Sequence, residues 1–177
     1  MVTITESGLI FGPYPENECF LVEKSATYQN IQSGVKMAEF LRLQRRDSKP
    51  PLILVIEAKS SSPRPETEPN FTQYIDEIRE KLTNGLVLTI ASILRRHEVA
   101  QRELSQEFKD LDLATCEFRL ILVINGHKKE WLPPLNDALT LSLHSTIKTW
   151  ALGATSVMVL NEEMASKLGL TCTPSSK

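Results

Sequence analysis

The chain has few cysteines and few glycines for its length of 177 residues. The cysteines, Cys19, Cys116 and Cys172, are odd in number and none belongs to a C-x-x-C pair. We therefore expect reduced thiols, and neither a disulfide framework nor a zinc site. The seven glycines are scattered along the chain, which disfavours the glycine-rich loops that cradle phosphates in the usual nucleotide-binding motifs.

Long apolar runs and an excess of positive charge are missing as well. The apolar runs are far shorter than the ~20 residues that a membrane span needs. The N-terminal stretch MVTITESGLIF has neither the basic region nor the long apolar core of a secretory signal. The formal net charge is −2, so no global field attracts nucleic acid. We expect a cytoplasmic protein that does not contact membranes, and whose contacts with nucleic acid come from local patches or from a partner.

What the chain does contain is an alternation of strand and helix patterns. Strand patterns occupy residues 35–43, 52–59, 116–126 and 156–161, with short strands or loops around residues 19–22. Helix patterns occupy residues 70 to about 98, 133–153 and 162–169, the first capped by Asn70 and the last by Asn161. This order predicts an α/β fold in which strand 52–59, the long helix and strand 116–126 form a right-handed parallel unit.

The length of the chain limits the number of domains. A second hydrophobic core would leave each half only marginally stable, so we expect one domain over residues 1–177. Residues 170–177, which end in TPSSK, are expected to form a flexible tail.

The stretch LILVIEAK, residues 52–59, ends in two charged side chains. Side chains alternate between the faces of a strand, so Glu57 and Lys59 project to the same side, with their Cα atoms roughly 6.5–7 Å apart. On the preceding strand, Glu39 is the only charged residue on a stripe that is otherwise apolar. A hairpin that sets Gln44 against Leu52 therefore places Glu39 opposite Glu57.

Two carboxylates that face each other in an apolar setting call for a cation. Such a pair repels by up to ~1 kcal/mol even on an exposed sheet, and burial would force one carboxyl group to stay protonated. A divalent cation removes this conflict, and Mg²⁺ prefers oxygen ligands. Lys59 would then lie beside the cation, where it can orient a water molecule or neutralise a phosphate oxygen.

The segments MAEFLRL and LILVIEAKSS resemble the core of the PD-(D/E)XK nuclease superfamily, in which an acid on one strand precedes Glu-x-Lys at the end of the next. The resemblance implies a restriction-endonuclease-like fold, a mixed sheet flanked by helices, and Mg²⁺- or Mn²⁺-dependent hydrolysis of phosphodiester bonds in DNA or RNA. It also implies that Glu39 and Glu57 are catalytic residues and metal ligands, and that the Ala58 carbonyl is a backbone ligand. Lys59 would position or activate the attacking water.

The resemblance leaves some residues open. The superfamily often adds a glutamate from an N-terminal helix, and the sequence does not choose among Glu16, Glu18 and Glu23. Gln73 and Tyr74, near the start of the long helix, are similar to a glutamine and a tyrosine that some relatives place there.

Several alternatives for single residues remain beside the nuclease-like site. Asp47 is a second candidate for the first acid, but it lies in a turn, and the Glu-x-Lys at Glu107 lies in a charged helical stretch rather than after a strand. Trp131 could stack on a base, although burial against the following helix is the expectation. The three histidines share no catalytic spacing, and Ser60, Ser61 and Ser62 are expected to form a flexible loop.

The targeting of the expected nuclease is a separate question, because the chain has no room for a recognition domain. We therefore expect a homodimer or a partner protein subunit, formed through the apolar residues of segment 131–150. The alternative function is a nuclease-like module that binds or assembles without catalysis. A separate structural alternative has Glu57 and Lys59 as solvated residues past the edge of the sheet and Glu39 facing water on an edge strand.

Overall fold

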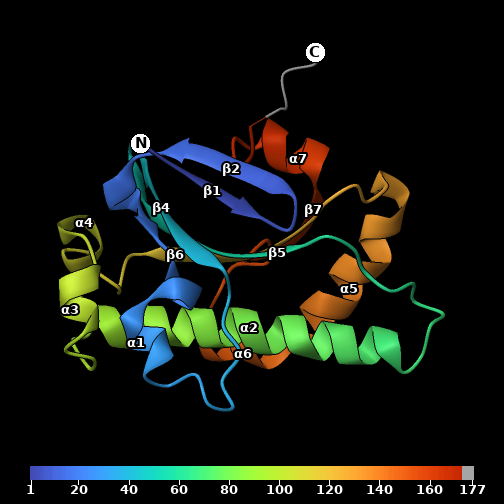
Figure 1. The fold of residues 1–177 in the computed structure, drawn as a ribbon, viewed down its shortest axis with the longest axis horizontal. Coiled ribbons are helices and arrows are strands. Elements are labelled where there is room, and N and C mark those ends of the chain that lie inside the picture. The colour runs from blue at the N-terminus through green and yellow to red at the C-terminus, as the bar shows by residue number, and fades with distance from the viewer. Residues whose placement is uncertain (173–177) are drawn as a thin grey trace.

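The computed structural model describes residues 1–172, which form a mixed sheet with helices on both sides and a separate hairpin (Figure 1). The strands are β1 (Val2–Glu6), β2 (Leu9–Tyr14), β3 (Cys19–Phe20), β4 (Phe40–Arg46), β5 (Lys49–Lys59), β6 (Glu117–Ile124) and β7 (Val157–Asn161). The α-helices are α1 (Ala26–Gln29), α2 (Asn70–Ile93), α3 (Ala100–Glu103), α4 (Gln106–Lys109), α5 (Leu132–Ser142), α6 (His144–Thr149) and α7 (Glu162–Lys167).

The main sheet has the order β3-β4-β5-β6-β7. Strands β4 and β5 form an antiparallel hairpin in which Gln44 pairs with Leu52 and Phe40 with Ile56, which is the expected register. Strands β5 and β6 are parallel and are joined through α2, and β7 is parallel to β6. The predicted α/β class, a mixed sheet flanked by helices, is confirmed, and it is consistent with the restriction-endonuclease-like arrangement.

Strand β5 is buried on both faces because it lies in the middle of the sheet. Ile53 and Val55 belong to the core that packs against α2, whereas Leu54 and Ile56 belong to a second core beneath the β1–β2 hairpin and α7. Figure 1 shows α2 running along one face of the sheet, with the hairpin and α7 on the other. Glu57 has the same strand parity as Ile53 and Val55, so it faces α2.

Helix α2 approaches the sheet closely at Gly85. A Cβ atom at this position would lie 2.8 Å from Val55 Cγ1 and 3.1 Å from Ala38 Cβ, so a larger residue would push the helix away. Lys81 is one helical turn before Gly85 and therefore lies on the same face of α2. The glycine thus brings Lys81 down onto the end of β5.

Several elements differ from the sequence-based expectation. The strand expected at 35–43 begins at Phe40, although the Glu39 N–H still donates to the Ile56 carbonyl at 3.1 Å. The helix expected over 133–153 breaks at Leu143 into α5 and α6. The β1–β2 hairpin was not expected at all, and it covers the second core.

The long helix starts and stops differently from the prediction. Its N-cap is Pro69 rather than Asn70. It ends at Ile93, rather than near residue 98, because Arg95 adopts a left-handed conformation with φ 60°. The N–H groups of Arg95 and Arg96 then donate to the carbonyls of Ser92 and Ala91, which is the Schellman pattern of helix termination. Glycine usually occupies this position, and because Arg95 takes its place, the sequence did not indicate the end of α2.

The C-terminal segment joins the fold further along than expected. Leu170 and Thr171 are buried, and the Cys172 N–H donates to the Ile10 carbonyl at 2.9 Å. The tail expected at 170–177 therefore does not begin at residue 170, and its remainder, 173–177, lies outside the described residues. Among residues 1–172, no helix is long and apolar enough to cross a membrane.

Candidate active site

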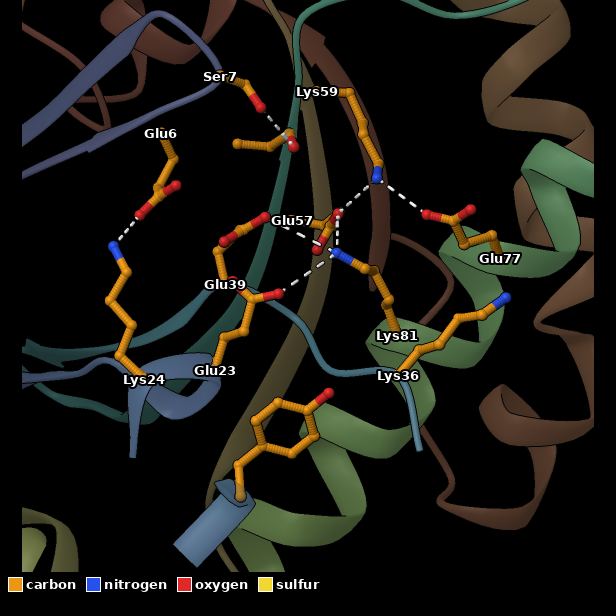
Figure 2. Close-up of polar contacts among 12 residues, drawn as sticks. Glu6, Ser7, Glu23, Lys24, Lys36, Glu39, Glu57, Lys59, Glu77 and Lys81 are labelled. Atoms are coloured by element: carbon orange, nitrogen blue, oxygen red, sulfur yellow. Dashed lines mark hydrogen bonds and ion pairs between the residues drawn. The ribbon is translucent and has the colours of Figure 1, made fainter. Parts of the chain in front are cut away.

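Glu57 is the most deeply buried charged residue of the candidate site, with an exposed fraction of 0%. Its Oε1 atom accepts a hydrogen bond from Lys81 Nζ at 2.9 Å and lies 3.3 Å from Lys59 Nζ. Its Oε2 atom is buried and has no hydrogen-bond partner among residues 1–172. Burial raises the pKa of this carboxyl group, and the two lysines act against that rise. Figure 2 shows the surrounding side chains.

Glu39 lies opposite Glu57, immediately before the first residue of β4. Burial, a hydrogen bond with the Glu23 carboxyl group and repulsion from Glu57 together raise the pKa of Glu39 to about 8. The raised pKa favours the protonated form of Glu39. This is the conflict that the two facing strands predicted: the carboxyl groups cannot all be ionised together.

Glu23 supplies a third carboxyl group from the short 3₁₀ turn Val22–Lys24. Its N–H donates to the Glu39 carbonyl at 3.4 Å, which holds this turn against the start of β4. Of the other N-terminal candidates, Glu18 instead lies 3.7 Å from the Arg42 guanidinium, and Glu16 is exposed in a separate 3₁₀ turn. The structure thus distinguishes three glutamates that the sequence left equivalent.

Lys81 is the central residue that sequence reasoning missed. Its Nζ atom lies 2.9 Å from Glu57 Oε1 and 3.8 Å from carboxylate oxygens of both Glu39 and Glu23 (Figure 2). Burial lowers the pKa of Lys81, but the three carboxyl groups outweigh burial and raise it above its ordinary value. One signal was available in the sequence: Lys81 lies between Ile78 and Leu82, on the apolar side of α2.

Lys59 is held between two carboxylates. Its Nζ atom lies 2.9 Å from Glu77 Oε1, on the first half of α2, and 3.3 Å from Glu57 Oε1. The hydrogen bond from Lys59 lowers the pKa of Glu77. Lys59 is partly exposed, so its ammonium group is accessible from the end of the sheet.

The Ala58 carbonyl, expected as a backbone ligand, accepts a hydrogen bond from Ser7 Oγ at 3.0 Å. Ser7 lies in the β1–β2 turn, which reaches over the end of β5 (Figure 2). A carbonyl oxygen has two lone pairs, so the bond from Ser7 leaves one free for a further contact.

The balance of charge bears on whether these residues fit a metal ion. The cluster contains four carboxyl groups (Glu23, Glu39, Glu57 and Glu77) and two ammonium groups (Lys59 and Lys81). Oxygen donors in excess over cations are what Mg²⁺ and Mn²⁺ require. Three of them, Glu23, Glu39 and Glu57, converge on Lys81 Nζ, however. Within residues 1–172, no three His, Cys, Asp or Glu residues are arranged to hold a metal ion. The donor types thus suit a divalent cation, but in their present arrangement they surround the Lys81 ammonium group.

Of the remaining candidates, Asp47 and Glu107 lie in other elements, whereas Tyr74 is near enough to Glu57 and Glu77 that their charges help to raise its pKa. Asp47 is exposed in the turn between β4 and β5. Glu107 lies in α4 and bonds to Asn17. Tyr74 is mostly buried at the start of α2, and Gln73 beside it is exposed.

Comparison with known proteins gives little beyond the fold. No model of a protein family and no curated protein matches the chain. The chain is similar to a solved structure of the restriction endonuclease FokI with a TM-score of 0.41 and 17% sequence identity, over 78% of this chain and 22% of the FokI chain. The chain thus spans less than a quarter of the length of that structure. A likeness this loose says nothing about activity, and the site has to be judged on its own geometry.

Proposed function

We propose that the chain is a nuclease that hydrolyses phosphodiester bonds of DNA or RNA with the help of Mg²⁺ or Mn²⁺. Glu39, Glu57 and Lys59 are its catalytic residues, and the metal ligands are the carboxylates of Glu39 and Glu57 and the carbonyl of Ala58. One observation carries the proposal: the buried carboxyl group of Glu57 meets the largely buried one of Glu39 at the end of the central strand, beside a partly exposed lysine. A purely structural strand end has no use for this costly arrangement.

The chain's own residues have distinct roles in this proposal. A bound divalent cation would supply charge stabilisation at the phosphate and a lower pKa for a bound water. Lys59 orients the attacking water and neutralises a phosphate oxygen, and it leaves its ion pair with Glu77 to do so. Glu23 adds a third carboxyl group to the site. Lys81 neutralises the carboxyl groups in the metal-free protein and turns away when the cation takes its place.

The rival function is a nuclease-like module that binds or assembles without catalysis. The observation in its favour is the Lys81 ammonium group, which stands 2.9 Å from Glu57 and is itself largely buried, with a side chain that is 12% exposed. If Lys81 stays there permanently, the carboxyl groups are already neutralised and a cation gains little. The two functions therefore differ in which cation the carboxyl groups hold.

A nuclease assay separates these functions. The wild type, Lys59→Ala and Glu57→Gln are compared on single- and double-stranded DNA and RNA, with Mg²⁺, with Mn²⁺ and with chelator. We expect cleavage only with metal, and a loss of about 10²-fold or more in Lys59→Ala, because removing one group that stabilises charge in the transition state costs about 10²–10³-fold. Glu57→Gln should also lose the heat of metal binding in calorimetry, because a neutral amide is a weaker ligand.

Matched controls come from the ion pair between Lys167 and Glu163 on α7, in which both side chains are exposed. Lys167→Ala and Glu163→Gln change the same residue types and should cleave like wild type. Equal cleavage by wild type and Lys59→Ala would point to a contaminant or another site. No cleavage of any substrate, together with no heat of metal binding, would favour the non-catalytic module.

A further inference from the structure

A cavity of about 580 Å³ opens beyond the ends of β5 and β6, next to the candidate active site. Its walls are the loop 60–66, the turn 125–127 and the start of α5, and Figure 1 shows that loop leaving β5 and passing close to α5. Ser60, the residue after Lys59, lines the cavity, and the Asn125 N–H donates to the Lys59 carbonyl at 2.9 Å. The cavity and Lys59 therefore share one strand end.

Trp131 gives the cavity an aromatic wall. Its side chain is 41% exposed, so the expected burial against the following helix is wrong. The Lys128 ammonium group lies 5.0 Å from the centre of the Trp131 ring, and the Arg64 guanidinium group lies 5.9 Å from it. Both cations lie over the ring itself, so a base that stacks on Trp131 takes the place of a cation, which then faces the phosphates. Proteins bind single-stranded nucleic acid with such pairs of aromatic and cationic side chains.

The polar groups of the cavity are held in place. The His127 ring packs edge-on against Trp131 at 5.3 Å, and Asn161 Nδ2 donates to the His127 carbonyl at 3.0 Å. Glu66 and Glu130 also line the cavity. Carboxylates repel phosphate but accept hydrogen bonds from the amino groups of bases. Both carboxylates are exposed, as are Arg64 and Lys128, so the lining offers hydrogen-bond acceptors to a base and cations to the adjoining backbone.

We propose that this cavity binds one unpaired base of the nucleic-acid substrate, stacked on Trp131, while the adjoining backbone passes Lys59. The inference rests on the proposed function, because it takes nucleic acid as the ligand. The volume is within the about 300–1,000 Å³ of ordinary ligand sites, and a base inside a duplex cannot enter it without being flipped out. The protein therefore prefers single-stranded or locally unpaired substrates.

The test measures binding by fluorescence anisotropy with the full chain in EDTA, where cleavage does not interfere. The probes are a labelled single-stranded oligonucleotide, its blunt duplex, and the same strand with abasic sites throughout. We expect the single strand to bind more tightly than both other probes. Trp131→Ala should weaken single-strand binding about 5- to 150-fold, as for the loss of one stacked base, whereas Trp131→Phe should keep most of it.

Trp150 provides the matched control, because it is exposed to a similar degree (40%) and does not line this cavity. Trp150→Ala should bind like wild type, and unfolding curves verify that each variant is folded. Equal binding of the abasic strand, or unchanged binding by Trp131→Ala, would overturn the inference. If cleavage still depends on Lys59 in that case, the proposed function survives alone. If binding depends on Trp131 but the wild type never cleaves, the inference about base binding is supported and the proposed nuclease activity is refuted.

Discussion

Replacing Lys81 with methionine is the sharpest test of the electrostatics at the end of β5. Methionine keeps much of the side-chain volume but removes the ammonium group that lies 2.9 Å from Glu57 Oε1 and 3.8 Å from Glu39 and Glu23. Because Glu57 is completely buried, it cannot exchange Lys81 for water. The variant should therefore be markedly less stable than wild type when metal is absent.

The size of the loss can be bounded. Removing one partner of a buried ion pair costs about 3–5 kcal/mol. At about 2–4 °C per kcal/mol for a chain of this size, the melting temperature should fall by about 6–20 °C. Glu57 keeps Lys59 at 3.3 Å and can also take up a proton, so we expect a value in the lower half of this range. The loss should be smaller at pH 5 than at pH 7, because protonation of Glu57 removes the unpaired charge.

Magnesium then distinguishes the two candidate functions. If Lys81 and Mg²⁺ compete for the same carboxyl groups, the variant should bind Mg²⁺ more tightly than wild type. A concentration 100 times the dissociation constant would restore about 2.7 kcal/mol. The measurement is thermal unfolding in EDTA and in Mg²⁺, with Lys167→Met on α7 as the control. Equal Mg²⁺-induced shifts for Lys81→Met and Lys167→Met would refute the argument that the carboxyl groups form a cation site.

Three further predictions concern titration, packing and assembly. The pKa of Glu39 is raised to about 8 in the folded protein, so its protonated form favours folding, and stability in EDTA should fall as the pH rises from about 4.5 to 8. The variant Glu39→Gln should flatten that fall. An unchanged pH profile of the melting temperature in this variant would contradict the prediction. Gly85→Ala should lower the urea midpoint of unfolding, because overpacking against Val55 costs about 1–3 kcal/mol, which exceeds the gain in helix propensity of about 1 kcal/mol. A higher midpoint would show that α2 can move to make room for the methyl group. Leu141 is 77% exposed on α5, so we expect a homodimer that the variant Leu141→Glu dissociates. Sedimentation of the wild type as a monomer at high concentration, without a co-purifying partner, would count against this expectation.

The sequence predicted the register of the β4–β5 hairpin well because it depends on local patterns. Strand periodicity and the turn at Asp47 fix the register, and the register puts Glu39 opposite Glu57. These relations involve residues fewer than twenty apart in the chain. They need no knowledge of how the helices pack.

The sequence did not predict the contacts that depend on packing between distant segments. Lys81 reaches Glu57 because Gly85 lets α2 lie close to Val55. A glycine in a helix does not reveal from the sequence which residue it packs against. Trp131 is exposed and faces the loop after Lys59 across a cavity, and hydrophobic periodicity does not predict the path of a loop. Glu23 differs from Glu16 and Glu18 only through the turn that holds it against Glu39.

Lys81 and Lys59 do not fully balance the charges and hydrogen bonds of the carboxyl cluster. This favours binding of an additional cation over a purely structural arrangement in which Lys81 stays among the carboxyl groups permanently. With Lys81 in place, Glu39 still needs a proton to be buried, and within residues 1–172 Glu57 Oε2 still has no donor. A buried acceptor without a partner costs about 1–3 kcal/mol, which a purely structural ion pair would not be expected to retain. A divalent cation among the same oxygens would displace the proton from Glu39 and give Glu57 Oε2 a partner. Binding of Mg²⁺ should therefore release protons at pH 7, and equal binding heats in buffers of different ionisation enthalpy would contradict this.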